Sequence, residues 1–309
     1  MFSDLVILYL FLGGAGAGLL VILSTLEALR FVGASSARWI SATVWIPSAF
    51  FRMAWPVSFV ILSMAILALI ADLGRPDRLF AFVLYPRLSV MTIGAYALAI
   101  AWGLSAILSL VSLLDGALWF DGIRPAVCAI GFISGLITCA YTGLLLQSSA
   151  AVLFWQTPFL TITFVLSSLS CGFALVMLVL TFIQERRPME YSIRFVMSAD
   201  SLLIAIEVVT LFFLVMRGFM TVGAEGSAWS VVGGDHSFAF WTGLVIAGLV
   251  VPFAIENTAL ARDVRPQLQW AALLILFGGL VLRWSVVVAG NYDPAQEVQG
   301  IFNTISALS

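Results

Sequence analysis

Charge is scarce in this chain, and lysine is missing altogether. Only 10% of the 309 residues are charged, whereas a soluble globular domain carries about 25%. All 14 basic residues are arginine, and the formal net charge is -2, so the chain has no basic face for nucleic acid. These deficits exclude a water-soluble enzyme and a nucleic-acid-binding protein.

Residues that hold metal centres are equally rare. The sole histidine, His236, lies in a Gly/Ser-rich stretch, whereas a membrane-embedded b-type haem normally needs two axial ligands from facing helices. The three cysteines, Cys128, Cys139 and Cys171, stand apart within apolar segments and form no CxxC pair. We therefore expect no haem, no disulfide framework and no metal in this chain.

Long apolar runs make up most of the sequence. Hydrophobic residues account for 62% of the chain, and about eight runs are long enough to cross a hydrocarbon core of about 30 Å. We expect an all-α, polytopic membrane protein whose first run is retained rather than cleaved. The expected spans are residues 5–29, 53–71, 90–114, 125–147, 158–183, 195–220, 238–260 and 268–289.

Arginine is shared unequally between the two sets of loops that alternating spans create. Nine arginines fall in one set and four in the other, while Arg283 lies inside the last span. Because arginine-rich loops stay in the cytoplasm, both termini are expected outside a bacterial or archaeal inner membrane. Three of the four outer arginines lie in residues 71–89 beside two aspartates. This loop is either locally neutralised or a polar docking surface.

Three polar side chains from different spans fall at a similar depth near the outer face: Tyr9, Asp72 and Tyr141. Phenol and carboxyl groups can form hydrogen bonds with the oxygen atoms of a quinone head group. Structural interpretations stay open, because tyrosine anchors membrane interfaces and Asp72 can pair with Arg75 in the segment DLGRP.

The first span contains the glycine-rich segment LGGAGAG, residues 12–18. It is not a dinucleotide-binding loop, because no strand precedes it. Gly14 and Gly18 instead form a small-xxx-small face, which suits helix packing or the close approach of a flat ring.

A second group of polar residues lies in the C-terminal half: Asp200, Glu207, Glu256 and Arg283. Asp200 and Glu207 are seven residues apart and hence nearly on one helical face. Ionisable groups inside a membrane are costly, so they either pair with one another or line a functional path. The sequence leaves both interpretations open, namely a proton path and structural ion pairs.

Two further features have structural interpretations. Glu27 and nearby Arg30 are expected to form an ordinary ion pair at the inner end of the first span. The tryptophans near span ends are typical of an aromatic belt at the membrane interfaces. They are Trp39, Trp45, Trp55, Trp119, Trp155 and Trp229.

Several segments, taken in order, resemble the NrfD/PsrC family, the integral membrane subunits of polysulfide, tetrathionate and related molybdopterin respiratory reductases. The resemblance spans nearly the whole chain. It rests on YLFLGGAGAG at residues 9–18, DLGRP at 72–76, SVMTIGAY at 89–96, YTGLL at 141–145 with Trp155 and Pro158-Phe159 downstream, and FGGLVLR at 277–283 followed by AGN at 289–291.

The resemblance implies a fold of two four-helix bundles, residues 1–150 and 151–309, without haem. It also implies a menaquinone or ubiquinone site at the outer face. Asp72 and Tyr141 match positions that line the family's quinone pocket, while Tyr9 matches a position where some members carry histidine. Arg75 joins this candidate set through its place beside Asp72. Arg283 and the acids of the sixth and seventh spans resemble the family's polar path toward the cytoplasm.

The resemblance further implies an iron–sulfur electron-transfer subunit, ferredoxin-like with four clusters, docked over the quinone site, together with a molybdopterin catalytic subunit. The predicted function is therefore a membrane anchor that exchanges electrons between the quinone pool and that iron–sulfur partner, with protons taken up or released through the membrane as a further option. Two alternatives stay open: a secondary transporter that uses the intramembrane acids as a relay, and a purely structural anchor.

Overall fold

Helices make up almost all of the described residues. The computed structural model describes residues 4–35, 46–73, 89–114, 122–149, 152–183, 190–234, 236–262 and 266–290, and no strand occurs among them. The long helices are α1 (Asp4–Ser35), α3 (Ser48–Leu73), α5 (Val90–Leu113), α6 (Arg124–Gln147), α7 (Pro158–Phe182), α8 (Glu190–Met220), the π-helix η3 (Ala239–Val250) with its continuation α10 (Val251–Arg262), and α11 (Pro266–Ala289). Short helices η2 (Leu153–Trp155) and α9 (Glu225–Val232) cap one end.

Eight segments in the described residues are long and apolar enough to cross a membrane, which confirms the expected polytopic all-α class. Their positions agree with the expected spans to within a few residues. The largest difference is in the second span, which begins at Ser48 rather than at residue 53. The charge of Arg52 interrupts the apolar run in the sequence, but Phe50 and Phe51 directly before it are buried and hold that turn in the helix.

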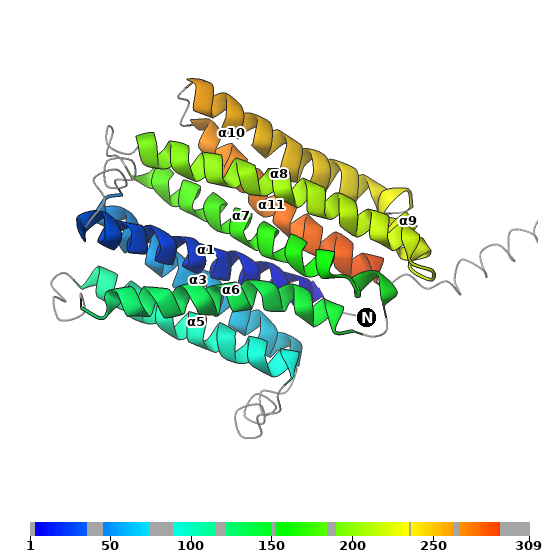
Figure 1. Cartoon of the computed structure of the whole chain (residues 1–309), viewed down its shortest axis with the longest axis horizontal. Helices are drawn as coiled ribbons and strands as arrows, with labels where there is room; N and C mark the ends of the chain where they lie inside the picture. The colour runs from blue at the N-terminus through cyan, green and yellow to red at the C-terminus, as the bar shows by residue number, and fades with distance from the viewer. Residues whose placement is uncertain are drawn as a thin grey trace, which may run out of the picture.

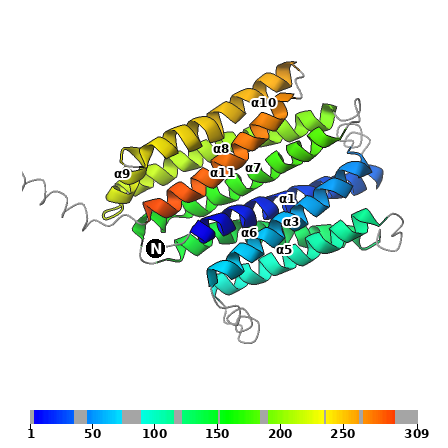
Figure 2. The ribbon, with the colours of Figure 1, turned by 180° about the vertical axis from the view of Figure 1, so that it is seen from behind.

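The central helix is α1, which is the most enclosed of the spans. It packs against α3 and α6 on one side and against α7 on the other, as Figure 1 shows. Seen from behind in Figure 2, α5 lies beside α3, and α11 lies beside α7 and η3–α10. The division into two four-helix bundles near residue 150 stays a prediction, because α1 packs as closely on α7 as on its sequence neighbours.

Glycines allow the closest helix contacts. A Cβ atom at Gly18 of α1 would overlap the backbone carbonyl of Ser168 on α7, and one at Gly172 would lie 2.5 Å from the carbonyl carbon of Gly18. On the other side of the molecule, a Cβ at Gly248 of η3 would lie 2.5 Å from the Cα of Gly278 on α11. In lipid, where apolar side chains gain nothing by leaving solvent, such backbone proximity stabilises helix pairs through dispersion contacts.

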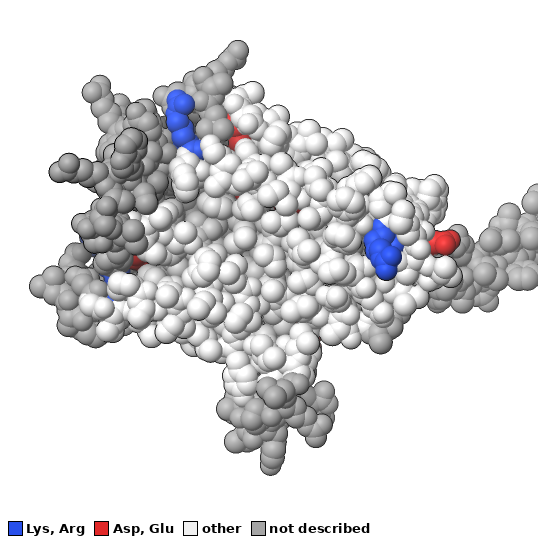
Figure 3. Space-filling view, in the orientation of Figure 1, with Lys and Arg blue, Asp and Glu red and all other residues white. Residues whose placement is uncertain are grey.

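The surface of the described residues matches a membrane environment. Figure 3 shows charged side chains near the two ends of the molecule and an almost uncharged face between them. Large apolar side chains of the membrane-spanning helices are exposed, among them Val60, Leu67, Leu110 and Phe212. The chain is therefore a multi-pass membrane protein.

The aromatic-belt interpretation is wrong for two tryptophans. Trp55 and Trp155 are fully buried, and the indole Nε1 of Trp155 donates a hydrogen bond to the carbonyl oxygen of Val286 at 2.9 Å. Trp229 is exposed, as a belt residue should be. The remaining three tryptophans, Trp39, Trp45 and Trp119, lie outside the described residues.

Candidate functional site

Two of the candidate quinone-binding residues meet inside the protein. Tyr9 on α1 and Tyr141 on α6 lie within interaction distance of each other, and both side chains are buried. The hydroxyl of Tyr9 has no hydrogen-bond partner in good geometry among the described residues. An unmet hydrogen bond costs a buried hydroxyl about 1–3 kcal/mol, so a ligand oxygen placed in good geometry beside this tyrosine pair would be bound favourably. The pair lies at the end of the molecule where α1 begins and α6 finishes, here called the tyrosine end.

Glycine on α5 makes room for this pair. A Cβ atom at Gly94 would overlap the ring of Tyr141, so only glycine lets α5 approach the tyrosine closely. The start of α5 is fixed by Ser89, whose hydroxyl accepts a hydrogen bond from the backbone N–H of Thr92 at 3.2 Å. Such an N-cap sets where the helix begins and therefore where Gly94 lies.

The other two candidates of that set are not buried with the tyrosines. Asp72 is exposed at the end of α3, where it has interactions of its own. Arg75 lies outside the described residues, as does the rest of residues 74–88, which includes the other arginines of that expected docking loop. Their roles stay predictions.

Arg283 joins three helices at the centre of the molecule. It is fully buried on α11, and its guanidinium donates hydrogen bonds to the carbonyl oxygens of Gly279 at 2.7 Å and Leu10 at 3.1 Å. It also donates to the hydroxyls of Ser168 at 2.8 Å and Ser167 at 3.3 Å. Because Leu10 follows Tyr9 directly, Arg283 fixes the α1 backbone beside the tyrosine pair.

The surroundings of the guanidinium are built to receive it. Its central carbon lies 5.7 Å from the ring centroid of Phe11 and 5.4 Å from that of Phe164, within the range of cation–π attraction. A Cβ atom at Gly14 would lie 2.6 Å from Nη2 of Arg283 and 2.5 Å from the hydroxyl oxygen of Ser168. Gly14 therefore leaves space for a side chain, while Gly18 leaves space for a backbone.

The three acids of the expected path continue from Arg283 toward the opposite end. Glu207 on α8 interacts with Arg283 and with the hydroxyl of Ser167. Asp200, two turns earlier on α8, interacts with Glu256 of α10 and with Glu207. All three carboxyl groups are buried. The structure thus brings the four candidate path residues into one polar zone that reaches the backbone next to Tyr9.

The relatives of this protein give the same assignment as its sequence pattern. The family described as "Polysulphide reductase, NrfD" matches residues 1–295. The chain belongs to the NrfD family. It is 24% identical over 304 residues to the C subunit of polysulfide reductase from Wolinella succinogenes, an alignment that covers 92% of each protein. It is also 27% identical over 162 residues to Protein NrfD of Escherichia coli K12, covering 50% of each.

Sequence reasoning missed the serines that line the polar zone of this NrfD-family chain. Ser167 and Ser168 contact Arg283, Ser170 lies near Asp200, and Ser201 donates a hydrogen bond to Oε2 of Glu256 at 2.8 Å. The signal was present as the run SSLS at residues 167–170, which is unusual inside an apolar span.

Glu27 has a partner that the sequence did not indicate. Its carboxylate forms an ion pair with Arg124 of α6, and its Oε2 lies 3.7 Å from the thiol sulfur of Cys128, which donates to it. The carboxylate also interacts with the indole of Trp55 and, more weakly, with Arg30. The expected local pair is therefore the lesser part of a cluster that joins α1, α3 and α6.

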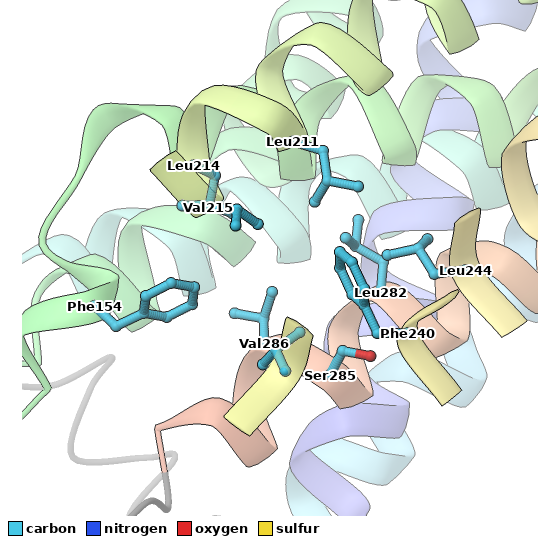
Figure 4. A pocket seen from close by; sticks show the side chains of 10 residues that line it. Phe154, Leu211, Leu214, Val215, Phe240, Leu244, Leu282, Ser285 and Val286 are labelled. Atoms are coloured by element: carbon cyan, nitrogen blue, oxygen red, sulfur yellow. The ribbon is translucent and has the colours of Figure 1, made fainter. Parts of the chain in front are cut away.

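Two remaining features carry no candidate residue. His236 packs edge-on against Trp284, with ring centroids 5.4 Å apart, and the described residues contain no group of three or more His, Cys, Asp or Glu that could hold a metal. Figure 4 shows a small pocket between η2, α8, α9, η3 and α11, lined by apolar side chains such as Phe154, Leu211 and Val286, with Ser285 as its one polar neighbour.

Proposed function

We propose that this NrfD-family chain is the quinone-reactive membrane subunit of a respiratory oxidoreductase. The observation that carries the proposal is the buried tyrosine pair, in which the hydroxyl of Tyr9 interacts with Tyr141 but has no hydrogen-bond partner in good geometry among the described residues. A quinone, when bound, supplies two-electron and two-proton chemistry. Tyr9 and Tyr141 would hold its head group by donating hydrogen bonds to its oxygen atoms. This fit supports menaquinone or ubiquinone as the substrate without distinguishing them.

The remaining parts of the assembly are proposed from the family. An iron–sulfur subunit would dock at the tyrosine end and exchange electrons with the quinone, and a molybdopterin subunit would carry out the terminal reaction. Asp72 and Arg75 would complete the rim of the quinone site. The tyrosine end, with both termini, would face outward from the inner membrane.

The polar zone supports proton transfer between the quinone site and the opposite end. Three carboxylates against one guanidinium would leave two negative charges uncompensated in a dry interior, so the acids must take up positive charge. The ionisable groups follow one another from α10 to the carbonyl of Leu10 on α1, in the order Glu256, Asp200, Glu207 and Arg283. We propose that protons occupy these acids and move between them during turnover.

Tyrosine hydroxyl removal tests the quinone site directly. Tyr141→Phe and Tyr9→Phe keep the ring packing but delete the hydrogen-bond donor and proton carrier. We expect quinol-dependent turnover of the purified complex to fall by roughly 100-fold, the lower range for general acid–base catalysis. Assembly with the partner subunits should persist. Full quinol turnover in both variants would refute the site and favour a purely structural anchor.

Two glycines on α5 provide a matched test of whether the position of the Tyr141 ring matters for quinol turnover. Gly94→Ala places a methyl group against the ring of Tyr141, whereas Gly103→Ala meets open space, since no other group lies within 4 Å of a Cβ there. We expect Gly94→Ala to raise KM for quinol and lower kcat, and Gly103→Ala to leave both unchanged. Equal kinetics for the two variants would show that Tyr141 does not contact the substrate.

A further inference from the structure

Buried oxygen atoms without partners are concentrated at one place among the described residues. Both carboxyl oxygens of Asp200, Oε1 of Glu256 and the hydroxyl of Ser170 have no hydrogen-bond partner in good geometry, although all are buried. They come from three helices, α8, α10 and α7, and Asp200 interacts with both Glu256 and Ser170. Ser201 adds a fifth oxygen, bound to Oε2 of Glu256. This group of four side chains is called the acid cluster below.

The charge of the acid cluster is not balanced by the groups that surround it in the described part of the chain. The groups that act most strongly on Asp200 by charge are Glu256 and Glu207, which are both acidic. Arg283 acts on Glu207, two helical turns away from Asp200. A proton shared between Asp200 and Glu256 would connect the two carboxyl groups but leave one full negative charge among buried side chains. Bare buried charge of this kind costs several kcal/mol.

The ligand chemistry of the acid cluster is that of a hard cation. Every available atom is a carboxylate or hydroxyl oxygen, and hard cations prefer oxygen ligands.

We propose that Asp200, Glu256, Ser170 and Ser201 form a binding site for one sodium ion, which competes with protons for the same carboxyl oxygens. One shared proton leaves a single negative charge on the Asp200–Glu256 pair, and the sodium ion neutralises that charge. The ion also contacts several of the oxygen atoms that have no hydrogen-bond partner in good geometry. The site requires neither a quinone nor electron transfer, so it stands independently of the tyrosine pair.

Direct binding of the radioactive sodium isotope ²²Na⁺ to the intact purified complex tests the proposal. The ionic strength is held constant with choline chloride. We expect saturable binding of about one ion per chain, displaced by unlabelled NaCl, displaced much less by KCl, and weakened as the pH falls because protons compete. Asp200→Asn and Glu256→Gln should weaken binding by about tenfold or more. Ser170→Ala, a smaller change that preserves packing, should weaken it measurably as well.

Two matched controls separate this site from other effects. Glu225→Gln removes an exposed acid on α9 and should leave sodium binding unchanged. Tyr141→Phe should also leave it unchanged while quinol turnover falls, so failure of one proposal is distinguishable from failure of the other. The sodium site is overturned by the absence of saturable binding in the wild-type complex, which would leave protons alone as the cation. It is also overturned by wild-type affinity in all three acid-cluster variants.

Discussion

Glu27 and Asp200 are both buried acids on membrane-spanning helices, but their surroundings differ. Glu27 receives an ion pair from Arg124 and a hydrogen bond from Cys128, while both carboxyl oxygens of Asp200 lack a partner in good geometry among the described residues. In the first case the protein itself supplies the compensating charge, which makes the group a link between α1 and α6. In the second, no described side chain supplies that charge in good geometry, which suits the exchangeable proton or sodium ion proposed above. The difference separates a structural acid from a candidate ion-binding acid.

The largest loss of stability is expected from substitution of Glu27, the acid that has an ion-pair partner. Glu27→Leu removes the ion pair with Arg124 and the acceptor of Cys128. It should lower the free energy of unfolding by about 3 kcal/mol, since removal of one partner of a buried ion pair costs about 3–5 kcal/mol and Arg124 is partly exposed. Denaturant unfolding in detergent measures it, with Glu27→Gln as a milder control. A loss below about 1 kcal/mol would mean that the pair does not join the helices.

An intermediate loss of stability is expected from substitution of Glu207. This acid interacts with Arg283, whose guanidinium also donates hydrogen bonds to carbonyl and hydroxyl oxygens. Glu207→Gln keeps an acceptor for Ser167 and removes only the negative charge. The free energy of unfolding should fall by about 1.5 kcal/mol, the value of a hydrogen bond or contact to a charged group. The same unfolding assay applies. A loss as large as that of Glu27→Leu would place Glu207 among the structural acids.

The smallest effect on stability is expected at Asp200. Asp200→Asn deletes a carboxylate that has no donor in good geometry among the described residues, and it supplies an N–H group beside Glu256, with which Asp200 interacts. The free energy of unfolding should stay within about 1 kcal/mol of the wild type or rise, because replacing uncompensated buried charge is often stabilising. A loss of about 3 kcal/mol, as predicted for Glu27→Leu, would remove the distinction between the two acids.

The depth of a residue in the membrane could be predicted from the sequence. The neighbouring helix toward which its side chain points could not. A helix rises by about 1.5 Å per residue, so counting residues placed Tyr9 and Tyr141 at one level and Asp200, Glu207 and Glu256 inside the apolar zone. Direction around the helix axis changes by about 100° per residue and depends on which helices are neighbours. The pairing of Glu27 with Arg124 rests on the contact between α1 and α6, which no local pattern encodes.

The same limit explains the other differences from expectation. Trp155 follows an interfacial pattern in the sequence but is buried, because η2 turns it toward α11 and the carbonyl of Val286. Gly94 was visible only as part of a family motif, and its use became apparent from the ring of Tyr141 against it. The π-helical turns of η3, which packs against α11, left no mark in an evenly apolar run.

The hydrogen bond from Arg283 to Leu10 joins residues 273 positions apart in the chain. A ribosome adds about 5–20 residues per second, so roughly 14 to 55 s separate the synthesis of these two residues. Throughout that interval α1 lies in the membrane without the contact that fixes its tyrosine end. The proposed quinone site therefore receives this support only from α11, the last of the described helices, and a chain that stops before α11 retains its tyrosines but not that contact.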